Sequence, residues 1–447
     1  MPGGFFAACA GGMCHRDKKT AGLKENGERQ MSKQTKDIIL RGGIVLDPSQ
    51  SMKKKADIRI SNGKIAEISE HMQENPAARA SEAGSATVVN VEGCYVTPGL
   101  IDMHCHIYPV FPVARDGLPT IQPEAHMFQS GVTTAVDAGT CGSRDFIRFK
   151  EEVIDKSRLR ILAFINIASG GMVNLDSEQD IREFHPEIAA AMAKTFDETV
   201  VGIKTAHYWV GKPFDEAHPA WESVDRCVQA GELCHKPVMA DFQPTLPGRP
   251  YEELILSKLR PGDIHTHVYA QQFPVLDESG CVRREMFAAR ERGVIFDLGH
   301  GAGSFWFRNA VPAWQQGFAP DVISTDLYLD NVAGPVINLT HVMSKYLSMG
   351  MTMEEVIFRT TKRPAEVIGH TELGDLRING CADIAVLKVQ EGQFGYADSG
   401  HARMNGSRRL ECVMTIREGT IVFDPMALAM PLWETAPEAY WRAPGVL

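Results

Sequence analysis

The stretch PGLIDMHCH, residues 98–106, guides how the rest of the chain is interpreted. It opens with a Pro-Gly turn signal, continues as a short apolar run and ends in His104 and His106. Residues two apart on a strand point to the same side, so both imidazoles can bind one ion, with nitrogens about 2.1 Å from zinc. Two hydrogen-bonded histidines without a metal would give the same HxH pattern, but the preceding PGLID favours the metal interpretation.

Short apolar runs alternate with helical patterns after residue 99, which indicates an α/β fold with a parallel sheet. Eight such units predict a closed (β/α)8 TIM-like barrel. The runs are LIDMHCH (100–106), VTTAVDA (132–138), RILAFINIA (160–168), VVGIKTA (200–206), PVMADF (237–242), DIHTHVY (263–269), VIFDLGH (294–300) and DVISTDL (321–327).

Both ends of the chain are β-rich in texture. Strand-like runs start at Asp37, with Asn62-Gly63 as a hairpin turn, and similar runs return after Gly369. We therefore predict a flanking β-sandwich built from residues 31–97 and 371–447, around a barrel at 98–370. Residues 1–30 are predicted to be a disordered extension, with Met31 as an alternative start.

Composition narrows the class of function. The 447 residues are 44% apolar and 23% charged, as in globular proteins, and their net charge of -10 argues against nucleic acid or anionic membrane as a partner. A small-molecule substrate is the better expectation. The ten cysteines include no CxxC pair, which favours reduced thiols and a cytoplasmic location. No apolar run reaches the roughly 18 residues of a membrane span.

Polar residues recur at the carboxyl ends of the predicted barrel strands, which meet over the barrel axis in this fold. All of them are potential metal ligands or proton carriers. They are His104 and His106 on the first strand, Lys204 on the fourth, Asp241 on the fifth, His267 on the sixth, His300 on the seventh and Asp326 on the eighth.

Taken one at a time, these residues have structural alternatives. Lys204 lies in an apolar strand, where burial disfavours the ammonium form and a neutral amine could form a carbamate that bridges two cations; an ordinary salt bridge is the alternative. His267 could be a hydrogen-bonded core histidine, and Asp326 a helix N-cap. Their joint placement at strand ends favours a site.

The predicted site has a coherent chemistry. A metal-bound water loses a proton near neutral pH, and the resulting hydroxide attacks a carbonyl that the ion polarises. We predict that Asp326 takes the proton from the water as general base and returns it to the leaving group as general acid.

At PGLIDMHCH, GIKTAH, DIHTH and STDL the chain resembles the amidohydrolase superfamily, particularly its amidohydrolase/deacetylase or dihydroorotase-like branch, over residues 37–424. The resemblance implies a barrel with a flanking β-sandwich, one or two divalent ions, most often Zn²⁺, and hydrolysis of amide or ester bonds in small molecules. Oligomers are common in this family, so the resemblance also implies a possible homo-oligomer. The implied metal ligands are His104, His106, Lys204 as a carbamate, His267 and Asp326.

Two positions depart from the family pattern. Asp241 stands where the fifth strand usually carries a histidine, so it either binds a shifted or exchangeable second metal through oxygen or orients a neighbour. Tyr108 stands where dihydroorotases, with HxHxR, carry the arginine that grips the substrate carboxylate. This argues against dihydroorotase activity.

Substrate contacts are expected from residues just beyond the strands. His207, Tyr208, His300 and Tyr328 either touch substrate or orient a metal ligand. Five aromatic residues either line an apolar pocket wall or belong to ordinary packing. They are Tyr108, Phe111, Trp209, Phe305 and Trp306.

The leading hypothesis is therefore a metal-dependent hydrolase of an N-acyl amino acid, a cyclic amide or an acyl ester. A non-catalytic barrel that serves as a binding or assembly protein is the alternative, and bound metal would separate the two. A third hypothesis is metal-assisted decarboxylation or isomerisation, which would not incorporate solvent oxygen into the product.

Overall fold

The computed structural model describes residues 37–72, 86–109, 119–241 and 248–441. The described residues belong to one compact unit, residues 35–447, and their strands form two sheets. The extension predicted at 1–30 lies outside the described residues.

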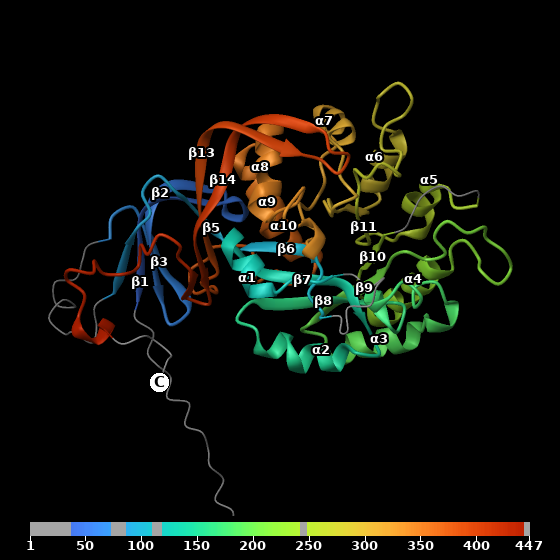
Figure 1. Ribbon diagram of the computed structural model, residues 1–447, viewed down its shortest axis with the longest axis horizontal. Helices are drawn as coiled ribbons and strands as arrows, with labels where there is room; N and C mark the ends of the chain where they lie inside the picture. The colour runs from blue at the N-terminus through green and yellow to red at the C-terminus, as the bar shows by residue number, and fades with distance from the viewer. Residues whose placement is uncertain (1–36, 73–85, 110–118, 242–247, 442–447) are drawn as a thin grey trace, which may run out of the picture. The chain divides into compact units, whose positions relative to one another are not determined.

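A seven-stranded parallel sheet holds the strand ends that carry the predicted site (Figure 1). Its strands follow chain order, and each lies within or overlaps a predicted apolar run. Such runs are rich in Val and Ile because parallel strands are covered on both faces. The strands are β6 (Leu100–Cys105), β7 (Val132–Gly142), β8 (Arg160–Asn166), β9 (Val200–Thr205), β10 (Val238–Ala240), β11 (Ile264–His265) and β12 (Ile295–Phe296).

The eighth predicted run, residues 321–327, is not a strand, so the sheet is not closed as a regular eight-stranded barrel. It makes one parallel bridge to each edge of the sheet, Asp297 with Val322 and Cys105 with Leu327. Side chains hold this seam, because the buried Asp102 carboxylate accepts hydrogen bonds from the Thr325 amide at 3.0 Å and hydroxyl at 2.5 Å. Backbone bonds add to this contact, because the His106 amide donates to the Leu327 carbonyl and the Leu298 amide to the Val322 carbonyl, each at 3.0 Å.

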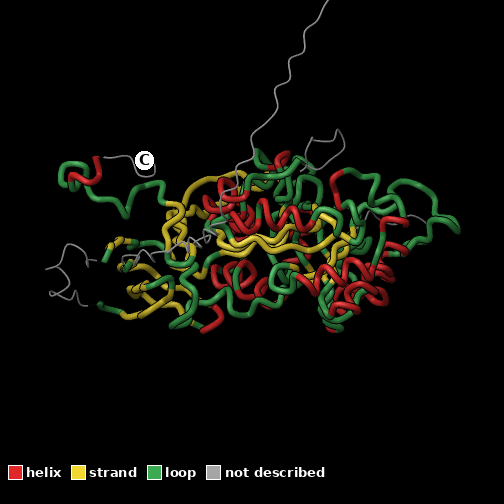
Figure 2. Tube along the Cα trace, turned by 90° about the horizontal axis from the view of Figure 1, so that it is seen from below, coloured by secondary structure: helices red, strands yellow, loops and turns green. Residues whose placement is uncertain are grey.

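Helices lie on both sides of the parallel strands (Figure 2). They match the helical patterns expected between the apolar runs, although α5 (Tyr251–Glu253) is a short α-helix followed by a π-helical turn at Leu254–Lys258. The helices are α1 (Pro123–Met127), α2 (Phe146–Glu152), α3 (Pro186–Thr195), α4 (Glu222–Cys234), α5 (Tyr251–Glu253), α6 (Arg284–Glu291), α7 (Phe307–Gln315), α8 (Leu339–Met349), α9 (Met353–Thr360) and α10 (Lys362–Val367).

The second sheet joins the two ends of the chain. It is one mixed eight-stranded sheet rather than the predicted two-sheet sandwich, because β5 pairs with β1 in parallel and with β13 antiparallel. Asn62 and Gly63 form the predicted hairpin turn with positive φ values of 49° and 75°. Its strands are β1 (Ile38–Asp47), β2 (Met52–Ser61), β3 (Lys64–Ser69), β4 (Thr87–Asn90), β5 (Tyr95–Pro98), β13 (Ile384–Ala397), β14 (Arg403–Arg417) and β15 (Thr420–Phe423).

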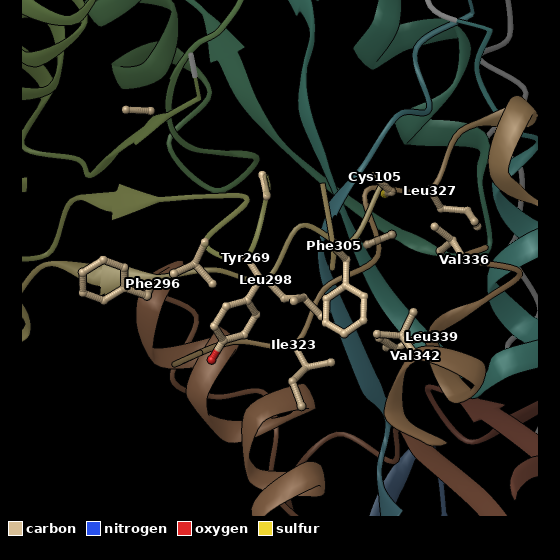
Figure 3. Close-up of a cluster of buried hydrophobic side chains, with 14 of the residues drawn as sticks. Cys105, Tyr269, Phe296, Leu298, Phe305, Ile323, Leu327, Val336, Leu339 and Val342 are labelled. Carbon is tan, nitrogen blue, oxygen red and sulfur yellow. The ribbon is translucent and has the colours of Figure 1, made fainter. Parts of the chain in front are cut away.

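The largest core lies between the parallel strands and the helices that cover them. Figure 3 shows part of it, where Phe305, Leu339 and Val342 are buried together with Tyr269 and other apolar side chains. This packing fixes α8 against the loop that follows β12. Within the described ranges, no helix is long and apolar enough to span a membrane.

Candidate metal centre

His104 and His106, at and just beyond the end of β6, direct the same ring nitrogen to one place. The Nε2 atoms of His104 and His106 lie 3.5 and 2.9 Å from Oδ1 of Asp326. Their Nδ1 atoms are occupied, in His104 by Asp297 at 3.2 Å and in His106 by the Thr140 hydroxyl at 2.7 Å. Fixing one ring nitrogen in this way orients the other, as metal-binding histidines require.

His267 and Asp326 complete the cluster, and both have unusual backbones. Their φ values are 61° and 50°, in the left-handed region that non-glycine residues seldom adopt and that is enriched at functional sites. The end of the eighth run is held by the Asp326 amide, which donates to the His104 carbonyl at 2.6 Å. One donor atom from each of His104, His267 and Asp326 lies within 4.8 Å of the others.

Asp241 and Lys204 lie beside His267. The Asp241 carboxylate accepts from Nε2 of His267 at 3.1 Å and is 4.0 Å from the Lys204 ammonium. Burial raises the pKa of Asp241, but the charges of His267, Lys204 and His207 outweigh it and lower this pKa below its usual value. Asp241 is therefore a carboxylate, available either to a cation or to His267.

The neutral ring of His104 makes its Nε2 suitable for binding a cation. Burial, together with the charges of Lys204 and His267, holds the pKa of His104 well below its usual value, so this ring is neutral. With its Nδ1 proton directed to Asp297, the Nε2 lone pair faces the Asp326 carboxylate. Two electron-rich atoms face each other there, an arrangement that a divalent cation between them would stabilise.

His267 is oriented in the same way but differs in charge, and its Nδ1 donates to the Gly299 carbonyl at 2.6 Å. Burial lowers the pKa of His267, but Asp241 raises it above its usual value, so Nε2 carries a proton at the position where a metal ion would bind. Gly299 allows this close approach, because its φ is 44° and a Cβ would lie 2.7 Å from Nδ1 of His267. The nitrogen and oxygen donors of this centre are those that zinc prefers.

These residues open onto a pocket of about 330 Å³. His104, His106, Asp241, His267 and Asp326 form its floor with ligand atoms, while other residues form its walls. The wall residues are Met172, His207, Gln272, Gly303, Ser304 and Tyr328. Lys204 is fully buried next to this floor, with Nζ 3.5 Å from the Met239 sulfur.

Two of the four predicted substrate contacts, His207 and Tyr328, line the pocket. Tyr208 and His300 do not. The Tyr208 ring is buried against Phe184, with 5.4 Å between ring centroids, and the His300 ring accepts from the buried Lys345 ammonium at 2.6 Å through Nε2. Both side chains are held away from the pocket by their own packing.

The predicted aromatic wall is not part of the pocket. Tyr108 packs on Phe149 and Phe305 lies in the core, while Trp209 stacks on His218 with centroids 3.4 Å apart. Trp306 also lies outside the pocket lining. Phe111 lies outside the described residues. The described lining is rich in polar side chains rather than in aromatic ones.

Several residues that support the site were not predicted. Burial raises the pKa of Asp297 to about 6, and this side chain binds the His104 ring and the hydroxyls of Thr266 and Ser324. Asp137 accepts from the amides of Ile107 and Tyr108 and so shapes the turn after His106. Each is an aspartate inside an otherwise apolar strand run, and that feature was the available signal.

No family model matches this chain. A deacetylase from Brucella anthropi is 31% identical over 321 residues, which cover 70% of this chain and 75% of that protein. A solved adenine deaminase matches 87% of this chain and all of its own at a TM-score of 0.75 and 25% identity. A solved dihydroorotase matches 87% of this chain and 99% of its own at 0.71 and 26%.

Proposed function

The chain belongs to the amidohydrolase superfamily and is a metal-dependent hydrolase of non-peptide carbon–nitrogen bonds, and we propose that it deacylates a small N-acyl compound such as an N-acyl amino acid. The observation that carries the proposal is the convergence of the His104 and His106 Nε2 atoms on Asp326 at the base of the pocket. The deacetylase name of the Brucella anthropi relative supports an acyl substrate.

His104, His106, His267 and Asp326 would hold the ion, with Asp241 as a further oxygen ligand. A bound divalent ion, for which Zn²⁺ is our proposal, would supply an acidified water and polarise the scissile carbonyl. Lys204 is buried 4.0 Å from Asp241, so a carbamate on its amine would place two more oxygens beside this group.

Asp326 is the residue that we propose moves the proton. Its Oδ1 lies between the two histidine rings, and its backbone is fixed by the bond to the His104 carbonyl. From this position the carboxylate would accept a proton from the attacking water and deliver it to the leaving nitrogen. Because Asp326 also lines the pocket, both transfers would occur next to the substrate.

A cyclic amide of the kind that a dihydroorotase cleaves is a less favoured substrate. Tyr108 lies where an arginine would be needed for dihydroorotase-like recognition, and it is buried against Phe149 rather than exposed in the pocket. We also propose a cytoplasmic location, supported by the cysteines of the described ranges, all of which are free thiols.

The first experiment is elemental analysis of the protein purified without chelators, alongside Asp326→Asn, Asp241→Ala and the exposed control Asp330→Asn. We expect about one or two equivalents of a divalent ion in the parent. Activity assays of the same proteins should show a fall in kcat of about 10²- to 10⁴-fold in Asp326→Asn, as for loss of a general base. Loss of one equivalent in Asp241→Ala would place a second ion at that residue.

Asp330→Asn should keep full activity, since Asp330 is exposed and lies outside the pocket lining. A folded parent that is metal-free and cannot be reconstituted would contradict the hydrolase mechanism. That result would favour the non-catalytic alternative of a binding or assembly protein.

A further inference from the structure

His207 differs from the other pocket residues because its charge is fixed by a buried partner. Its Nδ1 donates to Oε2 of Glu178 at 2.8 Å, and the Glu178 side chain is 2% exposed. The Glu178 Oε1 atom accepts from the Asn166 amide at 2.9 Å. Both oxygens of this side chain are thereby held in place by hydrogen bonds, as the geometry of a charge-assisted pair requires.

The other side of the His207 ring faces open space. Its side chain is 37% exposed and lines the pocket, and Nε2 makes no hydrogen bond with any of the described residues. Burial lowers the pKa of His207, but the charge and hydrogen bond of Glu178 raise it to about 9. At neutral pH the ring therefore offers a permanent cationic N–H donor.

The backbone keeps this donor in place. The His207 carbonyl accepts from the Gln179 side-chain amide, and Gln179 follows Glu178 directly in the chain. Residues 178 and 179 thus hold both the side chain and the backbone of His207. A fixed donor of this kind on a pocket wall binds an anionic acceptor better than a neutral one.

We infer that the substrate carries a carboxylate and that the Nε2–H of His207 binds it, so the class of substrate is an N-acyl amino acid rather than a neutral amide. This inference rests on the proposed function, because it concerns the same pocket. It assigns to His207 the recognition of substrate charge, and it leaves the cleavage step to the residues around Asp326.

The test compares N-acetyl amino acids with the corresponding N-acetyl amino-acid amides, which lack the negative charge. In the parent, the acids should have a kcat/KM about 10- to 100-fold above that of the amides, the range that a charge-assisted hydrogen bond provides. His207→Gln should lose this preference through a higher KM for the acids, with kcat and the metal content little changed.

His370→Gln is the matched control, because Nδ1 of His370 is also paired with a glutamate, Glu372, at 2.8 Å but lies outside the pocket lining. It should keep the preference. Equal kcat/KM values for acids and amides in the parent would overturn the inference without any variant, as would an equal loss for both in His207→Gln.

Calorimetric binding of the same compounds separates this inference from the proposed function. Acids that bind the parent more tightly than amides, with the difference lost in His207→Gln, support the inference even if nothing is hydrolysed, and the failure then belongs to the proposed chemistry. Acids that bind no better than amides, or no binding of the acids at millimolar concentration, would overturn it.

Discussion

At the scale of single residues, the site depends on which nitrogen of each histidine is already occupied. Asp297 occupies Nδ1 of His104, Thr140 that of His106, and the Gly299 carbonyl that of His267. These hydrogen bonds direct three Nε2 atoms toward the site. This arrangement is a preorganised ligand set, in which the cost of orienting the rings is met by the fold.

The ion pair of His207 and Glu178 gives a prediction about stability and pH. The pKa of His207 is raised from 6.5 to about 9, so its contribution is fully present below pH 6.5 and is lost as the pH rises through about 9. We expect His207→Gln to lower the free energy of unfolding by about 1 kcal/mol at pH 6, a modest value because the side chain is partly exposed.

Urea titrations of the parent and His207→Gln at several pH values would check this. The difference between the two proteins should shrink between pH 6.5 and 9.5. A difference that stays constant over this range would show that the ring is not held protonated by Glu178.

At the scale of elements, the hairpin of β13 and β14 reaches from the mixed sheet over α8 to the loop beside the pocket (Figure 1). Ser399, at its tip, accepts from the amides of Ser304 and Phe305 at 3.1 Å each through its hydroxyl. At the same end of the hairpin, the Ala397 carbonyl accepts a hydrogen bond from Nζ of the buried Lys345 at 2.7 Å. An element far along the chain thus positions Ser304, which lines the pocket.

Ser399→Ala should therefore weaken substrate binding more than it destabilises the fold. Loss of a shared acceptor costs about 1 kcal/mol, which corresponds to roughly a fivefold higher KM if the loop contacts substrate. Hydrogen exchange of residues 301–306 should become faster. The control Ser279→Ala removes a serine that bonds Asp277 in an exposed turn, and it should change neither KM nor this exchange.

An unchanged KM and unchanged exchange in Ser399→Ala would mean that the loop keeps its position without the hairpin tip. The Ser399 amide, which donates to the Phe305 carbonyl at 2.8 Å, would then be sufficient.

At the scale of the whole molecule, the site sits where the parallel sheet lacks a regular eighth strand. The seam is held by Asp102, Thr325 and the backbone bond from Asp326 to His104. Residues on both sides of this seam, His104 and Asp326, are proposed ligands of one ion. A bound ion would therefore tie the two edges of the sheet together and stabilise the folded protein.

Removal of the ion should lower the melting temperature of the parent. Ligand linkage gives about 2.7 kcal/mol when the free ion is at 100 times its dissociation constant. Thermal unfolding with excess zinc and with chelator measures the shift, and His267→Asn should reduce it because one ligand is lost. A melting temperature that is insensitive to chelator in a metal-loaded parent would exclude this stabilising role.

Much of this was predictable from local patterns. The seven apolar runs that became strands are buried on both faces, so their hydrophobic character was continuous and their polar residues were conspicuous. His104, His106 and His267 were predicted as ligands because each interrupts or ends such a run. The seam was not predictable, because residues 321–327 have the composition of a strand but make single bridges there.

The sequence by itself determined the α/β class, the order of the strands and the residues able to bind a metal, since these follow from the period of the apolar residues and from the chemistry of side chains at strand ends. Only the tertiary structure decided that Tyr208 and His300 are enclosed while His207 faces the pocket. It also decided that Glu178 and Ser399 act near the site. Those roles depend on contacts between residues far apart along the chain or on the direction of one side chain, which no local pattern of residues records.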